Sequence, residues 1–392
     1  MESFYKTHCD LIRNVHAPVR RLLMDEIDWN DRLIGIKGSR GVGKTTFLLQ
    51  YAKERFGCDR QCLYINFNNL YFAEHSLIGF VKEFYDQGGR VLLIDQTFKY
   101  ENWSAEIRMC YDTYADLQII FSGSSVMRLI DENDDLQDVV QVYNLRGFSF
   151  REYINLKTGQ QLPAYTLIEM MDNPMGIIKE LKKEVPDPVH YFDAYLKHGY
   201  YPFFLEKRNF SENLLKTMNM MMEVDILLIK QIELKYLSKI RKLLYIILQQ
   251  APGPLNISTL ANDIQTSRAT IMNYIKYLKD ARMLNTLYTE GEDYPKKPKQ
   301  LYAHNTNLMH AVFPNEVDRE AELRTFLYNA LHARHKVNMS RSPNDFLVDR
   351  QVNFKFDTRS QHRHGSKTYY AVDAPEVTNR KEIPLWLLGF LY

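Results

Sequence analysis

The chain has 392 residues, which is too long for one ordinary domain. Hydrophobic residues make up 45% and charged residues 25% of it, a profile that excludes a disordered or membrane-embedded chain. Lys and Arg number 50 against 48 Asp and Glu, so a bulk electrostatic attraction to nucleic acid is excluded, and any such contact must come from a local patch.

The N-terminus, MESFYKTHCD, lacks the apolar stretch of a signal peptide, and no apolar run approaches the ~20 residues of a membrane helix. We therefore expect a cytoplasmic protein without membrane contact. The cysteines are Cys9, Cys58, Cys62 and Cys110. No two of them have C-x-x-C spacing, so the sequence predicts ordinary reduced thiols rather than a zinc or redox site.

Short apolar runs alternate with helical patterns through residues 1–150, an order typical of a parallel α/β sheet. The candidate strands are Leu33–Lys37, Leu63–Phe67, Val91–Asp95, Leu117–Ser122 and Val140–Leu145. The helical patterns begin near Thr45, Ser76, Ser104 and Ser124. The order predicts an α/β fold of the P-loop nucleoside-triphosphatase type.

The strongest motif, RLIGIKGSRGVGKTTFLLQ, includes the first strand and the start of the first helix after it. It fits G-x-x-x-x-G-K-[ST] without a mismatch. Glycines let backbone N–H groups wrap phosphates, and the positive end of the helix dipole points at the anion. We expect Lys44 to reach the β- and γ-phosphates of ATP and the Thr45 hydroxyl to ligate magnesium. The predicted cofactor-binding residues are Gly38, Ser39, Arg40, Gly41, Val42, Gly43, Lys44, Thr45 and Thr46.

Two further strand ends complete the predicted catalytic set. VLLID ends in Asp95, the expected magnesium anchor, acting through water. Gln96 follows where many P-loop ATPases carry a glutamate base, and an amide can orient a water but cannot take its proton. LQIIFSGSS places Ser122 and Ser124 at the next strand end, where either would sense the γ-phosphate or, as a compatible alternative, cap the following helix.

The pattern turns helical over residues 151–236, which we expect to form a lid. Residues 237–305 have the rhythm of a small winged helix. Ser267 caps its second helix, from which Arg268, Asn273 and Lys276 face outward. Wing strands are expected at Met283–Tyr288 and Gln300–Ala303, with Lys296, Lys297 and Lys299 at the tip. Such a surface indicates contact with double-stranded DNA, although winged helices also serve in protein docking.

Residues 306–392 mix a helix with strand-like runs. The expected helix is Arg319–His332, and the expected strands are Asp345–Phe356, Thr368–Val372 and Pro384–Leu391. The last run, IPLWLLGFLY, indicates a buried terminal strand.

Seven segments together carry a resemblance to a known family. They are RLIGIKGSRGVGKTTFLLQ, IDQTFKYENWSAEIR, IIFSGSS, YNLRGFSFREYINL, YLKHGYYPFF, FLVDRQVNFKF and IPLWLLGFLY. The chain resembles a large prokaryotic family of AAA-type ATPases over nearly its whole length. Members of that family fuse an origin-recognition-like ATPase core to a winged helix and a C-terminal restriction-endonuclease-like domain of unknown function.

The chain departs from the family pattern in ways that bear on activity. The family usually reads Asp-Glu-x-His-Lys-Tyr where this chain has Asp95-Gln96-Thr97-Phe98-Lys99-Tyr100, and the arginine finger is missing at Leu136-Gln137-Asp138-Val139. Both losses indicate slow or absent hydrolysis. In the C-terminal part, Asp349 is kept, but Lys355 and Arg324 stand at the other acidic positions. That change argues against a nuclease metal site and favours a structural or partner-binding domain.

We therefore predict an ATP- and magnesium-binding switch protein with weak or absent ATPase activity. Its expected parts are an AAA-type core over 1–150, a helical lid over 151–236, a winged helix over 237–305 and a degenerate nuclease-like domain over 306–392. The alternative is a DNA-binding regulator that keeps ATP as a structural cofactor, and an unidentified protein partner is also expected. A P-loop kinase is a third class, for which the sequence offers no acceptor pocket.

Overall fold

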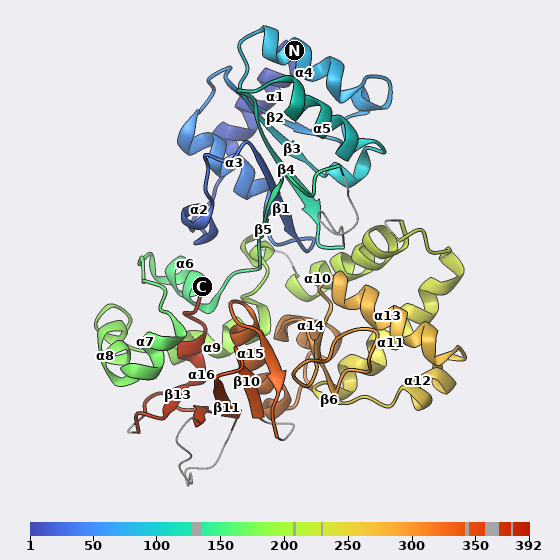
Figure 1. Ribbon diagram of the computed structural model, residues 1–392. Helices are drawn as coiled ribbons and strands as arrows, with labels where there is room; N and C mark the ends of the chain where they lie inside the picture. Colours follow the sequence, from blue (N-terminus) through green and yellow to red (C-terminus); the bar gives the residue numbers. More distant parts are fainter. Residues whose placement is uncertain (127–134, 207–208, 229, 342–344, 357–367, 378) are drawn as a thin grey trace. The chain divides into compact units, whose positions relative to one another are not determined.

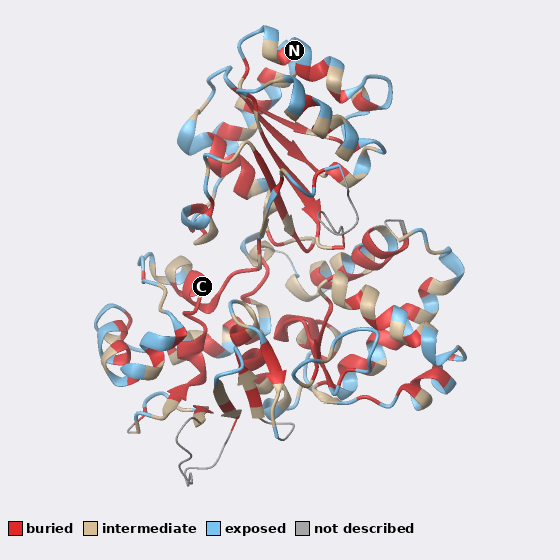
Figure 2. Cartoon of the chain, in the orientation of Figure 1, coloured by how far each residue is buried: buried red, intermediate tan, exposed pale blue. Residues whose placement is uncertain are grey.

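The computed structural model describes residues 1–126, 135–206, 209–228, 230–341, 345–356, 368–377 and 379–392. These residues form two compact units, Met1–Gly147 and Phe148–Tyr392, each with its own buried interior (Figures 1 and 2). None of the helices in those ranges combines the length and the apolar character that crossing a bilayer requires.

The first unit is a parallel five-stranded sheet with helices on its faces (Figure 1). Its strands are β1 (Leu33–Gly38), β2 (Cys62–Asn66), β3 (Val91–Asp95), β4 (Gln118–Ser124) and β5 (Gln141–Asn144). Its helices are α1 (Glu2–Asn14), α2 (Leu23–Glu26), α3 (Lys44–Arg55), α4 (Leu77–Asp86) and α5 (Trp103–Thr113), with 3-10 turns η1 (Leu70–Ala73) and η2 (Thr97–Lys99). The order β2-β3-β4-β1-β5 places β4 between β1 and β3.

Because this sheet is buried on both faces, its strands are continuous apolar runs in the sequence. Every residue of β3 is buried, and β1 is buried except for one half-buried position. All five predicted strands are confirmed, with ends shifted by at most two residues. The helices expected near Thr45, Ser76 and Ser104 are confirmed as α3, α4 and α5. The helix expected from Ser124 falls largely on residues 127–134, which lie outside the described residues.

The second unit begins with helices and continues with two small sheets. Its helices are α6 (Phe150–Thr158), α7 (Leu167–Asp172), α8 (Pro174–Glu184), α9 (Val189–His198), α10 (Phe210–Met220), α11 (Leu237–Gln250), α12 (Ile257–Ile264), α13 (Arg268–Asp280), α14 (Thr306–Val312), α15 (Arg319–His332) and α16 (Leu385–Leu388). Shorter turns are η3 (Pro202–Glu206), the π-helical η4 (Met221–Leu228) and η5 (Leu234–Tyr236).

The sheets of the second unit differ in strand direction. β6 (Gly253–Pro254), β7 (Leu284–Leu287) and β8 (Gln300–Ala303) are antiparallel in the order β6-β8-β7. The larger sheet has the order β13-β12-β11-β10-β9. Its strands are β9 (Val337–Met339), β10 (Asp345–Val348), β11 (Val352–Phe356), β12 (Thr368–Val372) and β13 (Glu382–Pro384). The pairs among β9, β10 and β11 are antiparallel, and those among β11, β12 and β13 are parallel.

Two of the expected strands in this part need correction. Asp345–Phe356 is a hairpin rather than one strand, because the chain reverses at Asp349 and Arg350, which have φ of 49° and 60°. Pro384–Leu391 is wrong as a strand, since only Pro384 belongs to β13 and the helix α16 follows. The helix Arg319–His332 and the strand Thr368–Val372 are confirmed as α15 and β12.

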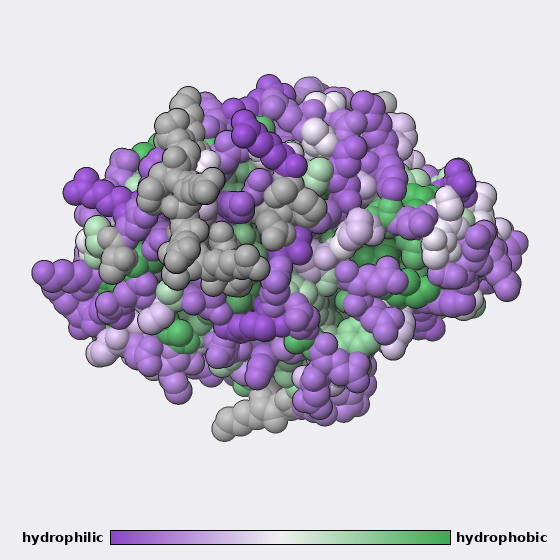
Figure 3. Space-filling view, turned by 90° about the horizontal axis from the view of Figure 1, so that it is seen from below, coloured by the Kyte–Doolittle hydropathy of each residue, from purple (hydrophilic) through white to green (hydrophobic). Residues whose placement is uncertain are grey.

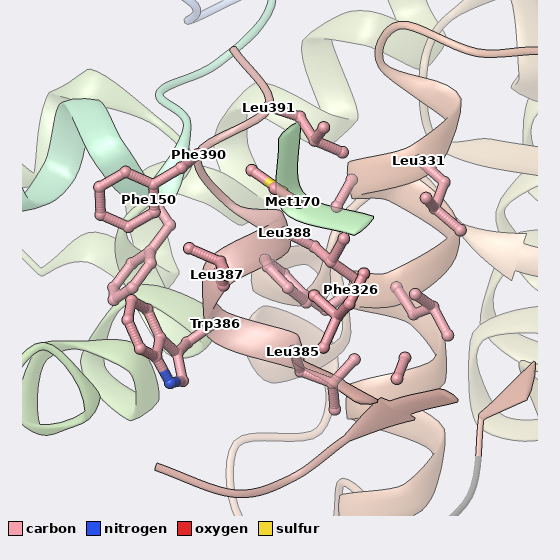
Figure 4. Close-up of a cluster of buried hydrophobic side chains, with 14 of the residues drawn as sticks. Phe150, Met170, Phe326, Leu331, Leu385, Trp386, Leu387, Leu388, Phe390 and Leu391 are labelled. Carbon is pink, nitrogen blue, oxygen red and sulfur yellow. The ribbon is translucent and has the colours of Figure 1, made fainter. Parts of the chain in front are cut away.

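The C-terminal segment forms part of the core of the second unit (Figure 4). Trp386 is only 2% exposed and Phe390 is fully buried. The Phe390 ring meets the Phe150 ring edge-on, with 6.0 Å between their centroids. Met170 and Phe326 belong to the same cluster, so the end of the chain joins helices α6, α7 and α15.

Replacing Trp386 tests how much this segment stabilises the second unit. We expect Trp386→Ala to lower the free energy of unfolding by about 3–5 kcal/mol, because it leaves a cavity in the core. Trp386→Phe should cost less than half as much. It keeps an aromatic ring and removes a buried ring N–H that finds no hydrogen-bond partner among the described residues. Chemical denaturation followed by circular dichroism measures both, and equal losses would contradict this packing.

Candidate functional site

The loop between β1 and α3 has the backbone conformation of a phosphate cradle. Gly41 and Gly43 have φ of 83° and 94°, a left-handed region that residues with a Cβ rarely adopt. A Cβ on Gly38 would lie 2.4 Å from the carbonyl oxygen of Leu145, so this position also requires glycine. The glycines therefore allow consecutive backbone N–H groups to turn toward one anion at the start of α3.

Lys44, the first residue of α3, folds over this loop. Its Nζ donates to the carbonyl oxygens of Gly38, at 2.8 Å, and Ser39, at 3.0 Å. The ammonium group thus lies beside the loop backbone, where an anion bound to the cradle would meet it. Val42 and Ser39 are buried and anchor the loop, whereas Arg40, Gly41 and Thr46 are half-buried.

Asp95 is the buried centre to which the neighbouring elements connect. It is 1% exposed and ends β3. Its Oδ2 accepts from Thr45 Oγ1 at 2.6 Å and from the Tyr64 hydroxyl at 2.9 Å. Its Oδ1 accepts from the Ser122 hydroxyl and from the backbone N–H of Gln96 at 3.0 Å. The carboxylate therefore joins β2, β3, β4 and the first turn of α3.

Tyr64 belongs to the site, although no motif in the sequence predicted it. It lies on β2, and burial together with the Asp95 carboxylate raises its pKa above the usual value. The phenol therefore keeps its proton and stays a donor to Asp95. Asn66, two positions along the same strand face, also approaches Asp95 Oδ2, at 3.5 Å. Tyr64 and Asn66 are polar residues at alternate positions near the end of a buried strand, and this pattern in the sequence could have indicated that both belong to the site.

Gln96 has the backbone conformation and contacts of a constrained residue. Its φ of 59° is left-handed, which is uncommon for a residue with a Cβ. Its Oε1 accepts from Asn68 Nδ2 at 2.8 Å, and its backbone N–H lies 3.2 Å from Ser122 Oγ. The side-chain amide is thus held at the carboxyl end of the sheet, next to Asp95.

The two serine candidates differ in their surroundings. Ser122 is fully buried and donates its hydroxyl proton to Asp95. It is therefore a support for that carboxylate rather than the cap of a helix. Ser124 is the last residue of β4, and its Oγ accepts from the N–H of Val126 at 3.4 Å. The helix that Ser124 was expected to cap falls on residues outside the described ranges, so capping stays a prediction.

Arg21 is a second residue that motif reading did not identify. Its guanidinium is buried and donates to the Val42 carbonyl at 3.2 Å. It also donates to the carbonyls of Arg146, at 2.6 Å, and Gly147, at 3.1 Å. One side chain therefore ties the phosphate loop to the last residues of the first unit.

The oxygen ligands at this site suit a magnesium ion. The Thr45 hydroxyl and the Asp95 carboxylate face each other directly, and Mg²⁺ prefers few protein oxygens together with phosphate and water. No cluster of three His, Cys, Asp or Glu that could hold a metal occurs among the residues described by the structure.

Asp349, Lys355 and Arg324 stand where restriction-endonuclease-like domains carry their acidic site residues, and here they do not form a site. Asp349 lies in the hairpin turn and accepts from His335 Nδ1 at 2.6 Å and from the N–H of Lys336 at 2.8 Å. Lys355 lies opposite Asp345, at the far end of the same hairpin. Arg324 interacts with the Tyr302 hydroxyl, in the packing of α15. Asp349 therefore has a structural role in the turn.

The segment expected to meet DNA has the predicted helices and strands, and two of its wing lysines share one glutamate. Ser267 caps α13 by accepting from the N–H of Thr270, and Arg268 and Asn273 are exposed. Glu292 lies 3.7 Å from Lys296 Nζ and 3.6 Å from Lys299 Nζ. These lysines are therefore a weaker attraction for phosphate than their number indicates.

A small groove lies within this segment. It holds about 70 Å³ and lies between the end of α11 and the start of α12. Its lining combines apolar and polar residues: Ile247, Pro254, Leu255, Leu260 and Leu301 with Gln250, Asn256, Thr259 and Asp263. Figure 3 shows hydrophobic side chains at the right of the lower face, on the side where Figure 1 places α11, α12 and α13. Protein docking thus stays open as the alternative use of this segment.

Family models match two parts of the chain. Residues 30–154 match an AAA domain, and residues 189–319 match a domain of unknown function. An uncharacterised protein of Methanocaldococcus jannaschii is 26% identical over 284 residues, which are 68% of this chain. The matched stretch spans 59% of the length of that curated relative. The AAA match includes the phosphate loop, Asp95 and both serines.

Two solved structures have a limited structural similarity to this chain. The AMPPCP-bound DnaA of Aquifex aeolicus is 17% identical, with a TM-score of 0.26, over 70% of this chain and 87% of that one. The ORC1 protein of Aeropyrum pernix in complex with DNA is 9% identical, with a TM-score of 0.30, over 80% and 92%. Likenesses at this level tell nothing about ligands or partners of the present chain.

Removing the Tyr64 hydroxyl tests the Asp95 network. We expect Tyr64→Phe to lower the free energy of unfolding by about 1–3 kcal/mol, because a buried carboxylate loses a donor. The matched control is Tyr51→Phe, whose buried hydroxyl donates at 3.3 Å to the neutral amide of Gln118. Urea denaturation of both variants gives the comparison, and an equal or larger loss in the control would contradict the role assigned to Tyr64.

Proposed function

We propose that this chain binds ATP with magnesium at the phosphate loop and works as a nucleotide-dependent switch with weak ATPase activity. The observation that carries the proposal is the 2.6 Å contact between Thr45 Oγ1 and Asp95 Oδ2. It joins the first turn of α3 to the carboxyl end of β3. The AAA match over residues 30–154 supports the same reading.

Each residue of the site has a role in this proposal. The backbone of residues 38–43 binds phosphate oxygens, and Lys44 Nζ turns from the Gly38 and Ser39 carbonyls toward them. Thr45 and Asp95 would hold the magnesium ion. The metal supplies positive charge that neutralises the phosphates.

Weak hydrolysis follows from the chemistry of Gln96. An amide cannot accept the proton that an attacking water must lose, and its Oε1 is already engaged by Asn68. Ser122 donates to Asp95 and so keeps that carboxylate oriented rather than acting on water. Ser124, at the strand end, is the sensor candidate that this arrangement favours.

The switch would operate through Arg21. Its guanidinium binds the Val42 carbonyl in the phosphate loop and the Arg146 and Gly147 carbonyls at the end of the first unit. A shift of the loop on nucleotide binding would therefore displace the backbone that leads into the second unit.

For the rest of the chain we propose the division into a lid over 151–236, a winged helix over 237–305 and a nuclease-like domain without activity over 306–392. The capped helices α12 and α13 beside the β6-β8-β7 sheet support the second assignment. The turn role of Asp349 supports the lack of activity in the third. An unidentified protein is the partner proposed for this half of the chain.

Turnover tests whether Gln96 limits the reaction. We expect the parent to bind ATP with magnesium but to hydrolyse it slowly, and Gln96→Glu to raise turnover roughly tenfold or more by supplying a base. Binding is measured by calorimetry and turnover by phosphate release.

The binding controls come from the same helix. Lys44→Ala should lose ATP binding, whereas Lys53→Ala, an exposed lysine of α3, should retain it. Unchanged affinity in Lys44→Ala would show that the phosphate site is wrongly assigned. If Gln96→Glu binds ATP and stays inactive, the missing base is not what limits hydrolysis.

Duplex DNA is the second ligand that we propose, supported by the exposed start of α13. Arg268 is exposed, and Lys276 lies 4.7 Å from the ring centre of Tyr294. The logarithm of the binding constant should fall linearly with the logarithm of salt concentration, and Arg268→Ala or Lys276→Ala should each reduce that slope by about 1. Lys183→Ala, an exposed lysine of α8, is the control for both. Binding is measured by fluorescence anisotropy of a labelled duplex. An affinity that changes neither with salt nor with either substitution would exclude DNA as a ligand.

A further inference from the structure

Helix α1 lies against the turn between α3 and β2 through a series of contacts. Near its start, Glu2 pairs with Arg60 at 2.6 Å, and the Tyr5 hydroxyl donates to the Arg60 carbonyl at 3.1 Å. Further along, His8 Nε2 donates to the Gly57 carbonyl at 3.3 Å. The helix therefore lies along this turn, with Glu2 and Tyr5 beside Arg60 and His8 beside Gly57.

Each residue of the His8–Gly57 contact is followed in the chain by a cysteine. Cys9 follows His8 and Cys58 follows Gly57, and both are free. The pKa of Cys9 is raised to about 11 by partial burial and by a hydrogen bond with Cys58. The two thiols therefore lie close enough to interact, although the residues are far apart in the sequence and have no motif spacing.

The two cysteines also differ in access to solvent. Cys58 is exposed and Cys9 is half-buried, whereas Cys62 and Cys110 are buried. Burial raises the pKa of the Cys110 thiol to about 12, so it stays protonated and unreactive. A dissolved oxidant would therefore meet Cys58 first, with Cys9 beside it as the resolving thiol.

We propose that Cys9 and Cys58 form a reversible redox-modification site, at which a low-molecular-weight disulfide converts the two thiols into a disulfide that fastens α1 to the α3–β2 turn. The proposal does not depend on nucleotide binding, because it rests on contacts within the first unit alone.

The exchange proceeds in two balanced steps. The Cys58 thiolate attacks one sulfur of oxidised glutathione, forming a mixed disulfide and releasing one glutathione thiolate. Cys9 then loses its proton to solvent, and its sulfur attacks the Cys58 sulfur, releasing the second glutathione. Overall, two protein thiols are oxidised to one disulfide, and one glutathione disulfide is reduced to two glutathione thiols.

The crosslink would stabilise the side of the sheet that supports the phosphate site. The N–H of Tyr64 donates to His8 Nδ1 at 3.0 Å, and the Tyr64 hydroxyl donates to Asp95. Fixing α1 therefore secures the strand whose side chain holds Asp95. The disulfide also closes a loop of about 50 residues in the unfolded chain, which lowers the entropy of that state.

The test treats the full-length protein with oxidised glutathione. We expect intact-mass analysis to show a loss of two hydrogens. Maleimide labelling should detect two fewer free thiols, and digestion should release a peptide in which Cys9 and Cys58 are crosslinked. Dithiothreitol should reverse all three changes. The melting temperature of the first unit should rise by roughly 5 °C or more on oxidation.

Matched variants separate the crosslink from other oxidation. Cys58→Ser and Cys9→Ser should each abolish the crosslink and the rise in melting temperature, with Cys9→Ser leaving a stable glutathione adduct on Cys58. Cys110→Ala should keep both. The proposal is overturned if the parent accumulates only the Cys58 adduct, if the crosslink joins other cysteines, or if Cys9→Ser still shows the rise.

Discussion

The arrangement of the first unit depends on one buried charge, the carboxylate of Asp95. A carboxylate that is 1% exposed is costly unless donors surround it. Thr45, Tyr64 and Ser122 donate to it from α3, β2 and β4. These donors come from separate parts of the chain, so a single charge holds three strands and the phosphate-loop helix in register. The same oxygens are those that a magnesium ion would use, which links stability and ligand chemistry in this unit.

The sequence predicted the strands and the phosphate loop well because both follow local rules. Buried parallel strands are continuous apolar runs, and the loop needs glycine where φ is positive. Tyr64 and Arg21 escaped prediction because their partners are distant: Tyr64 meets Asp95, and Arg21 meets Gly147. Such side-chain pairs depend on how elements are packed, which local patterns do not contain.

The errors in the second unit have a different origin. Residues 385–388 are all buried, so their apolar run has no polar face by which a helix could be told from a strand. Asp349 was expected inside one continuous strand, Asp345–Phe356. Its φ of 49° instead shows a hairpin turn, where aspartate is favoured for its backbone geometry. Polar residues in motifs can thus be explained by local conformation as well as by chemistry.

The guanidinium of Arg21 also bears on how this unit can deform. A planar group with donors in fixed directions binds three carbonyl oxygens from two distant backbone stretches. Neither stretch can slide past the other without breaking a charge-assisted hydrogen bond in a buried place. The phosphate loop and the backbone of Arg146 and Gly147 are therefore expected to move as one stiff piece. A lysine at this position, with one nitrogen on a freely rotating stem, would let the two stretches move independently.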